Sequence, residues 1–304
     1  MRCIELYKEQ MELEKGNNAD INLKLPGFLD AYYDLFTKFN LLELSPKRLE
    51  EIFREESLKI QKEHGEEVLA FALYLEKLIE KSAVKIQKKL KVKKLPDTIL
   101  FIGDGTIDGH GLLIKDSAYG FFELTTLKEG LKQYHTDAFI THELLHPLHY
   151  QESPEFFSMN WKTTEEYYFK RMFSEGLATF FSGEICKLPP QVAFWFGFLE
   201  QEELNKWMDY CEERKAAIGT QLMNSIKAEK IDSGLYRQLF SIEGFEKLTE
   251  YRLAYYYGYE IVKRIQGIFS PQELLSMKYE EVRPYILKYF GFEEPKGRSG
   301  ESKT

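Results

Sequence analysis

The sequence predicts an α+β fold that is predominantly helical. A helical pattern of apolar residues covers most of the first 95 residues and returns from Thr136 to about residue 290. Between these two regions, β-prone residues and clustered glycines occupy residues 98–124. The chain has 304 residues, 43% of them apolar, which is enough for one large domain or two modest ones with a buried core.

The N-terminal region, residues 1–95, is expected to be mostly helical. Ser45-Pro46 favours a helix start, because a capping hydroxyl precedes a proline in the first turn. The lysine-rich stretch Lys81–Lys94 holds seven lysines and no acid, which is typical of a solvated face; an acidic partner is the alternative. An apolar stripe at helical spacing predicts a buried helix face there: Val68, Ala72, Leu75, Ile79, Ala83, Ile86 and Leu90.

Residues 98–124 are expected to form a small antiparallel sheet. Strands are predicted at 98–102, 112–114 and 119–124, with glycine-rich turns between them. Gly103-Asp104-Gly105 resembles the start of a nucleotide-binding loop. That interpretation fails because the third glycine falls one place late and a strand follows instead of a helix.

The second helical region is predicted to hold several helices. Thr163 with Glu166, and Ser270 with Glu273, have the spacing of capping boxes. Helices are expected near 136–148, 164–184, 191–228 (broken), 248–267 and 271–290. We therefore predict a second region at 96–292, followed by a polar tail at 293–304 that is expected to be mobile.

The chemistry is concentrated in His142-Glu143-Leu144-Leu145-His146, an H-E-x-x-H motif on a predicted helix. Histidines four residues apart lie one above the other on a helix face, so that two imidazoles can bind one metal ion. Glu143 is rotated away from that face and can reach a water held by the metal. Zinc lowers the pKa of such a water, and a nearby carboxylate can take its proton. A structural pair of histidines is the alternative.

A catalytic zinc site needs a third protein ligand and one open position. Glu175 is the preferred candidate, because a lone carboxylate in an apolar helical stretch is costly unless it meets a cation. Glu152, ten residues after His142, and His149, seven residues after it, stay open as alternatives. Pro147 argues against His149, since proline kinks a helix. His64 and His110 carry no pattern.

H-E-x-x-H followed about 30 residues later by Glu175-Gly176-Leu177-Ala178 resembles the gluzincin branch of zinc metallopeptidases, and more narrowly a bacterial family of uncharacterised, predicted Zn-dependent proteases. The later segment Tyr255–Val262 is similar to a tyrosine- and glycine-containing helix of such families. The resemblance covers roughly residues 98–267. It implies a zincin-like catalytic region in which His142, His146 and Glu175 bind one zinc ion and Glu143 is general base, later proton donor.

Two positions depart from the family pattern. Pro147 follows the second histidine, so the helix is expected to end there, and Thr179 stands where the best-known gluzincins carry an aspartate that orients a histidine. A tyrosine hydroxyl could stabilise the oxyanion, and Tyr255 is our candidate, with aromatic packing as the alternative. The resemblance also implies that an extended peptide binds along a sheet edge, for which residues 119–124 are a candidate.

These observations predict a zinc-dependent metallopeptidase that acts on a peptide or protein substrate. The alternatives are a non-catalytic binding or regulatory protein that retains a zincin-like fold, and a metallohydrolase of small amides. A net charge of −8 argues against a nucleic-acid partner, and no apolar run approaches the ~20 residues of a membrane span. Three scattered cysteines and a charged N-terminus without signal features favour a cytoplasmic location. The oligomeric state stays open.

Overall fold

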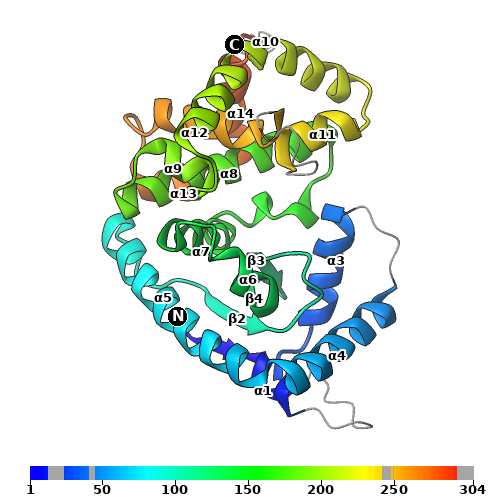
Figure 1. The fold of residues 1–304 in the computed structure, drawn as a ribbon. Coiled ribbons are helices and arrows are strands. Elements are labelled where there is room, and N and C mark those ends of the chain that lie inside the picture. The colour runs from blue at the N-terminus through cyan, green and yellow to red at the C-terminus, as the bar shows by residue number, and fades with distance from the viewer. Residues whose placement is uncertain (13–23, 41–44, 242–247, 249, 293–304) are drawn as a thin grey trace, which may run out of the picture. The chain divides into compact units, whose positions relative to one another are not determined.

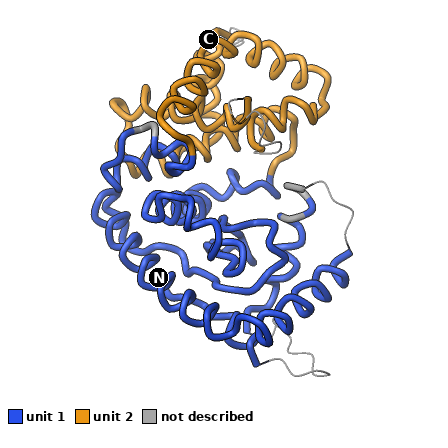
Figure 2. The backbone as a smooth tube through the Cα atoms, viewed as in Figure 1, with its two compact units in different colours: residues 1–160, 178–198 blue, residues 161–177, 199–304 orange. Residues whose placement is uncertain are grey.

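The structure is a computed structural model of the chain, and it describes all residues except 13–23, 41–44, 242–247, 249 and 293–304. The described part is mostly helical with one small sheet, which confirms the predicted class at that level. It divides into two compact units, drawn in different colours in Figure 2. Unit 1 holds residues 1–160 and 178–198, and unit 2 holds 161–177 and 199–304. The tail at 293–304 lies outside the described residues, and the predicted regions 1–95 and 96–292 stay predictions.

The sheet of unit 1 is mixed, and not antiparallel as the sequence predicts. Its order is β1 (Cys3–Glu5), β2 (Asp97–Phe101), β4 (Ser117–Glu123) and β3 (Gly109–Ile114). β1 and β4 both run parallel to β2, and only the β3–β4 hairpin is antiparallel. Its turn, Lys115-Asp116, has positive φ at both residues, as a tight two-residue hairpin turn requires. Because the hairpin brings the chain back beside β2, β4 is an interior strand, so the candidate edge at 119–124 was wrong.

Helices cover both faces of this sheet (Figure 1). On one face α7 (Thr136–Glu152) approaches Gly120 of β4 through Leu144 and Pro147. Phe121 points to the opposite face because side chains alternate along a strand, and it packs there against Tyr32 of α3 (Phe28–Asn40). α1 (Leu6–Met11) and α4 (Pro46–Glu63) belong to the same unit, and Ser45 caps α4 as predicted.

The long helix α5 (Gly65–Leu90) has the buried stripe that the sequence predicts, and all seven apolar positions are buried. Part of its lysine-rich end binds neighbouring helices within unit 1. The Nζ atoms of Lys81 and Lys85 lie 3.3 and 2.5 Å from a carboxylate oxygen of Asp137 at the start of α7. Lys89 pairs with Glu184. The two pairs with Asp137 hold α5 against α7, which carries the H-E-x-x-H motif, and the pair with Glu184 joins α5 to α8.

The remaining elements of unit 1 are short: α6 (Leu124–Gly130), the 3₁₀ turns η1 (Pro154–Phe156) and η2 (Ser158–Asn160), and α9 (Pro190–Trp195). α8 (Thr164–Cys186) is one continuous helix, of which residues 164–177 belong to unit 2 and 178–186 to unit 1. No helix among the described residues is both long enough and apolar enough to cross a membrane.

Unit 2 is helical throughout its described part. It comprises residues 164–177 of α8 with α10 (Gln201–Lys227), α11 (Ser233–Phe240), α12 (Leu253–Ile265), α13 (Pro271–Ser276) and α14 (Tyr279–Tyr289). The predicted helix at 271–290 is therefore two helices. Ser270 and Glu273 form the predicted capping box, and the helix that they begin ends at Ser276. A new helix starts at Tyr279, where Glu281 accepts a hydrogen bond from the backbone N–H of Lys278.

Candidate metal centre

The H-E-x-x-H motif lies at the middle of α7, a helix whose residues 138–150 are all buried. Contrary to the prediction, Pro147 does not end this helix, which continues to Glu152. The helix continues through Pro147 because two glycines of the sheet leave room for the proline ring. A Cβ atom at Gly120 would touch Pro147 Cγ at 3.4 Å. A Cβ atom at Gly111 would lie only 2.8 Å from the backbone nitrogen of Pro147. Packing of the ring against two glycines compensates for the lost hydrogen bond of the helix.

His142 and His146 face each other one turn apart. Their Nε2 atoms lie 3.2 Å apart, and each residue is only 1% exposed. Two nitrogens bound at about 2.0–2.1 Å to a tetrahedral zinc ion stand about 3.3 Å apart. The pair therefore has the separation that a shared zinc ion requires. The ring of His142 also packs edge-on against Phe196, which limits its rotation.

Glu175 supplies a carboxylate close to this pair. It lies on α8 just before the residues of that helix that belong to unit 1, and it is 3% exposed. His142, His146 and Glu175 form a group of buried residues whose ligand atoms all lie within 4.8 Å of one another. Two imidazoles and a carboxylate are a common donor set for a catalytic zinc ion. The residues that the sequence predicts as ligands thus fit zinc in donor type and in separation.

The Glu175 carboxylate also has a cationic neighbour that the sequence did not reveal. Arg171 precedes it by one turn of α8, with its Nε 3.8 Å from Glu175 Oε1. The guanidinium donates a hydrogen bond of 2.7 Å to the Tyr236 hydroxyl and lies over the ring of Phe240. Only 12% of the Arg171 side chain is exposed. A cation at this depth attracts the Glu175 carboxylate and limits where that carboxylate can turn.

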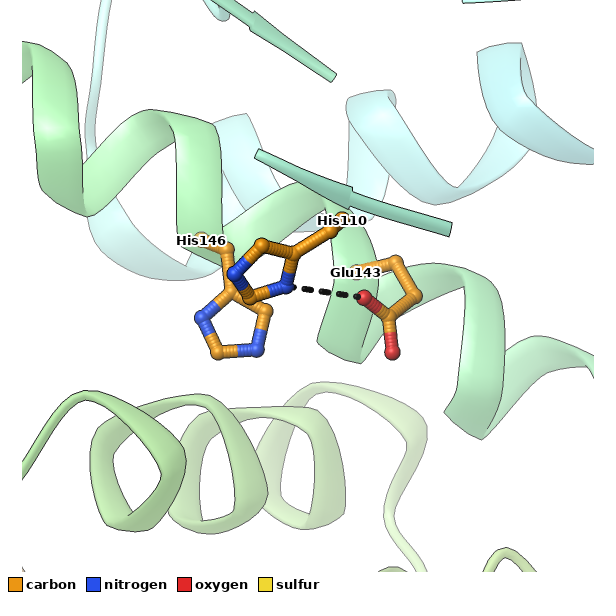
Figure 3. A group of neighbouring side chains, drawn as sticks. All are labelled: His110, Glu143 and His146. Carbon is orange, nitrogen blue, oxygen red and sulfur yellow. Dashed lines mark ion pairs between the residues drawn. The ribbon is translucent and has the colours of Figure 1, made fainter. Parts of the chain in front are cut away.

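Glu143 lies beside His110 of β3, a residue to which the sequence assigns no role (Figure 3). His110 Nδ1 is 3.9 Å from Glu143 Oε2, and the two side chains are 11% and 10% exposed. His110, Glu143 and His146 are a second group whose ligand atoms lie within 4.8 Å of one another. The only local signal was Gly109-His110-Gly111, a histidine between two glycines. The contact depends on strand β3 meeting helix α7, which no local pattern reports.

The two alternative ligands belong to neither group. Glu152 is exposed at the end of α7, where it accepts a hydrogen bond from Gln151. His149 is buried and packs on the ring of Phe156, with ring centroids 4.6 Å apart. Burial and the neighbouring His146 lower the pKa of His149 to about 3, so its imidazole is neutral near pH 7.

Tyr255 lies on α12 in unit 2, and its ring stacks on the guanidinium of Arg252 at 3.7 Å. The two tyrosines that follow have their hydroxyls engaged within the same unit. Tyr256 donates to Glu212 at 2.5 Å, and Tyr257 donates to the carbonyl oxygen of Cys211 at 2.8 Å. The role of Tyr255 in oxyanion stabilisation stays a prediction.

No family model matches this chain, and no curated protein or solved structure is significantly similar to it. The gluzincin resemblance therefore stays a prediction from the motif residues alone. What the structure adds is that the ligand atoms of His142, His146 and Glu175 lie within 4.8 Å of one another, with Glu143 next to His142 on α7.

Proposed function

We propose that this protein is a zinc-dependent metallopeptidase that hydrolyses peptide bonds. The observation that carries the proposal is the donor set: two Nε2 atoms 3.2 Å apart with a buried carboxylate close by. His142, His146 and Glu175 would hold one zinc ion per chain. When bound, zinc polarises the substrate carbonyl and lowers the pKa of water, which is the chemistry that this donor set is suited to supply.

Glu143 is the group that moves the proton. Its carboxylate takes a proton from the attacking water and then delivers it to the leaving amine, so that one residue serves both halves of the reaction. The low exposure of Glu143 supports this role, because a carboxylate shielded from bulk water interacts more strongly with a proton or a cation. A purely structural zinc site has no use for a second acidic side chain in this position.

Strand β3 is the proposed docking edge for an extended substrate. Among the described strands it pairs only with β4, and it carries His110 beside Glu143. Main-chain hydrogen bonds along such an edge bind a peptide in extended form without demanding particular side chains. This support favours a peptide over a small amide, since a small amide has no backbone to pair with the strand.

The first experiment measures metal and activity in the wild type and in three variants. We expect about one zinc per wild-type chain by mass spectrometry, and loss of that zinc in His146→Ala. Glu143→Gln should keep the zinc and the melting temperature while peptide cleavage falls by at least a hundredfold. His64→Ala is the matched control, because His64 is half exposed at the start of α5 and should leave both readouts unchanged.

Two outcomes would contradict the proposal. A wild-type protein that retains no zinc after zinc is offered and washed away would mean that the histidine pair is structural. Unchanged cleavage in Glu143→Gln would exclude Glu143 as the base. Peptides of increasing length, compared with blocked single residues, separate a peptidase from a small-amide hydrolase, because only a peptidase gains from chain length.

A further inference from the structure

His110 lies beside the proposed base Glu143 and is not part of the H-E-x-x-H motif. Its Nδ1 lies 3.9 Å from Glu143 Oε2, and its Nε2 lies 3.3 Å from the hydroxyl of Tyr150 (Figure 3 shows the first contact). Its ring centroid is 4.6 Å from that of His146. A side chain held between a base and a phenol at this depth has little freedom to turn.

The backbone around His110 is shaped for this contact. A Cβ at Gly111 would lie 2.8 Å from the backbone nitrogen of Pro147 and 2.8 Å from the ring of Tyr150. Strand β3 therefore approaches α7 more closely than a residue with a side chain would permit. Because Gly111 has no side chain, β3 can lie close to α7, and the imidazole of the neighbouring His110 can come near Glu143.

We propose that His110 is a positioning residue that holds the Glu143 carboxylate in the orientation needed to take a proton. The inference rests on the proposed function. In the proposed tautomer, Nε2 accepts from the Tyr150 hydroxyl and Nδ1 carries the proton, because Nδ1 is the nitrogen that lies 3.9 Å from Glu143 Oε2. Hydrogen bonds of catalytic groups are commonly long in the absence of substrate and shorten when it binds. A shift of the Glu143 carboxylate by about 1 Å toward Nδ1 would give a hydrogen bond of ordinary length.

The test uses three substitutions that separate the two ring nitrogens. His110→Ala removes both, His110→Asn keeps an N–H donor near the position of Nδ1, and His110→Gln keeps one near Nε2. We expect His110→Ala to lower kcat for a peptide roughly 10- to 100-fold, the range for a hydrogen bond to a charged group, with KM changed less than about threefold. His110→Asn should recover most of kcat, and His110→Gln should not. Zinc should stay at one per chain in all three.

Three results would overturn the positioning role. Loss of zinc in His110→Ala would make the residue a ligand, as the second group of possible ligands allows. Equal recovery by His110→Asn and His110→Gln would show that orientation toward Glu143 is irrelevant. An unchanged kcat in His110→Ala would show that the contact has no catalytic consequence. His64→Ala again serves as the control for the loss of an imidazole elsewhere.

A second readout does not depend on activity. In the metal-free protein, the free energies of unfolding of His110→Ala, Glu143→Ala and the double variant form a thermodynamic cycle. We expect the two effects to be non-additive, and additive effects would exclude the contact. If the wild type neither binds zinc nor cleaves any peptide, the proposed function fails, while the cycle still decides whether His110 and Glu143 interact.

Discussion

At the scale of single residues, the contact between Arg171 and Glu175 makes the sharpest prediction. Both side chains are nearly buried, with Arg171 Nε 3.8 Å from Glu175 Oε1. Arg171→Met removes the cation and leaves a carboxylate in a poorly hydrated site, so we expect the free energy of unfolding to fall by about 3 kcal/mol. Adding Glu175→Gln should recover part of that loss. Urea denaturation of the metal-free protein measures both changes.

The control and the decisive comparison use the same assay. Lys206→Met breaks an exposed pair with Glu202 and should change stability by less than about 0.5 kcal/mol. Added zinc should then stabilise Arg171→Met more than it stabilises the wild type, because the metal no longer competes with the guanidinium for Glu175. Equal stabilisation of the two proteins would argue that Glu175 is not a ligand.

At the scale of elements, α8 and α12 are in contact at a pair of glycines within unit 2. A Cβ at Gly176 would lie 2.0 Å from the backbone carbonyl carbon of Gly258, so the two helix backbones touch directly. Gly176→Ala must push the helices apart, and we expect a loss of at least about 3 kcal/mol in unfolding free energy. Gly267→Ala is the matched control, because nothing lies within 4 Å of its Cβ position, and it should be neutral. Equal melting temperatures for the two variants would contradict the close contact.

Local patterns predicted the helices better than the sheet. The buried face of α5 and the caps at Ser45 and Ser270 were correct, because each depends only on residues within a few turns of one helix. The strand order was not predicted, since pairing of β1 with β2 joins residues 95 positions apart. Pro147 was expected to end α7, and only the packing of its ring on two glycines of the sheet explains why it does not.

In the candidate site, too, features that depend on local spacing were predicted, and features that depend on how distant elements pack were not. The spacing of His142 and His146, and the isolated acid in an apolar helix, were enough to predict three side chains that the structure brings together. His110 and Arg171 were missed for different reasons. His110 reaches Glu143 from a strand, and its position relative to α7 depends on how the sheet packs. Arg171 is one turn from Glu175 on the same helix, and this i, i+4 spacing of opposite charges is a local signal in the sequence.

At the scale of the whole molecule, partly buried carboxylates in both units predict how stability depends on pH. Asp97 pairs with Arg2 and Asp137 with Lys85 in unit 1, while Glu165 in unit 2 accepts hydrogen bonds from Arg283 and Tyr279. Burial alone would raise the pKa of each carboxyl, but these partners outweigh it and the pKa of all three lies below the ordinary value.

The sign of the pH effect follows from those shifts. Between the folded pKa and the higher unfolded pKa, the unfolded chain binds more protons, so the stabilisation is complete above about pH 5 and is lost as the pH falls toward 2. Urea midpoints at pH 7, 5, 4 and 3 should therefore decrease on the acid side. Glu165→Gln should lower stability at pH 7 and flatten that decrease, because one of the shifted groups is gone. Substitution of the exposed Glu213 by Gln should leave the slope unchanged. Midpoints that stay constant down to pH 3 would mean that these ion pairs contribute no net stability to the folded chain.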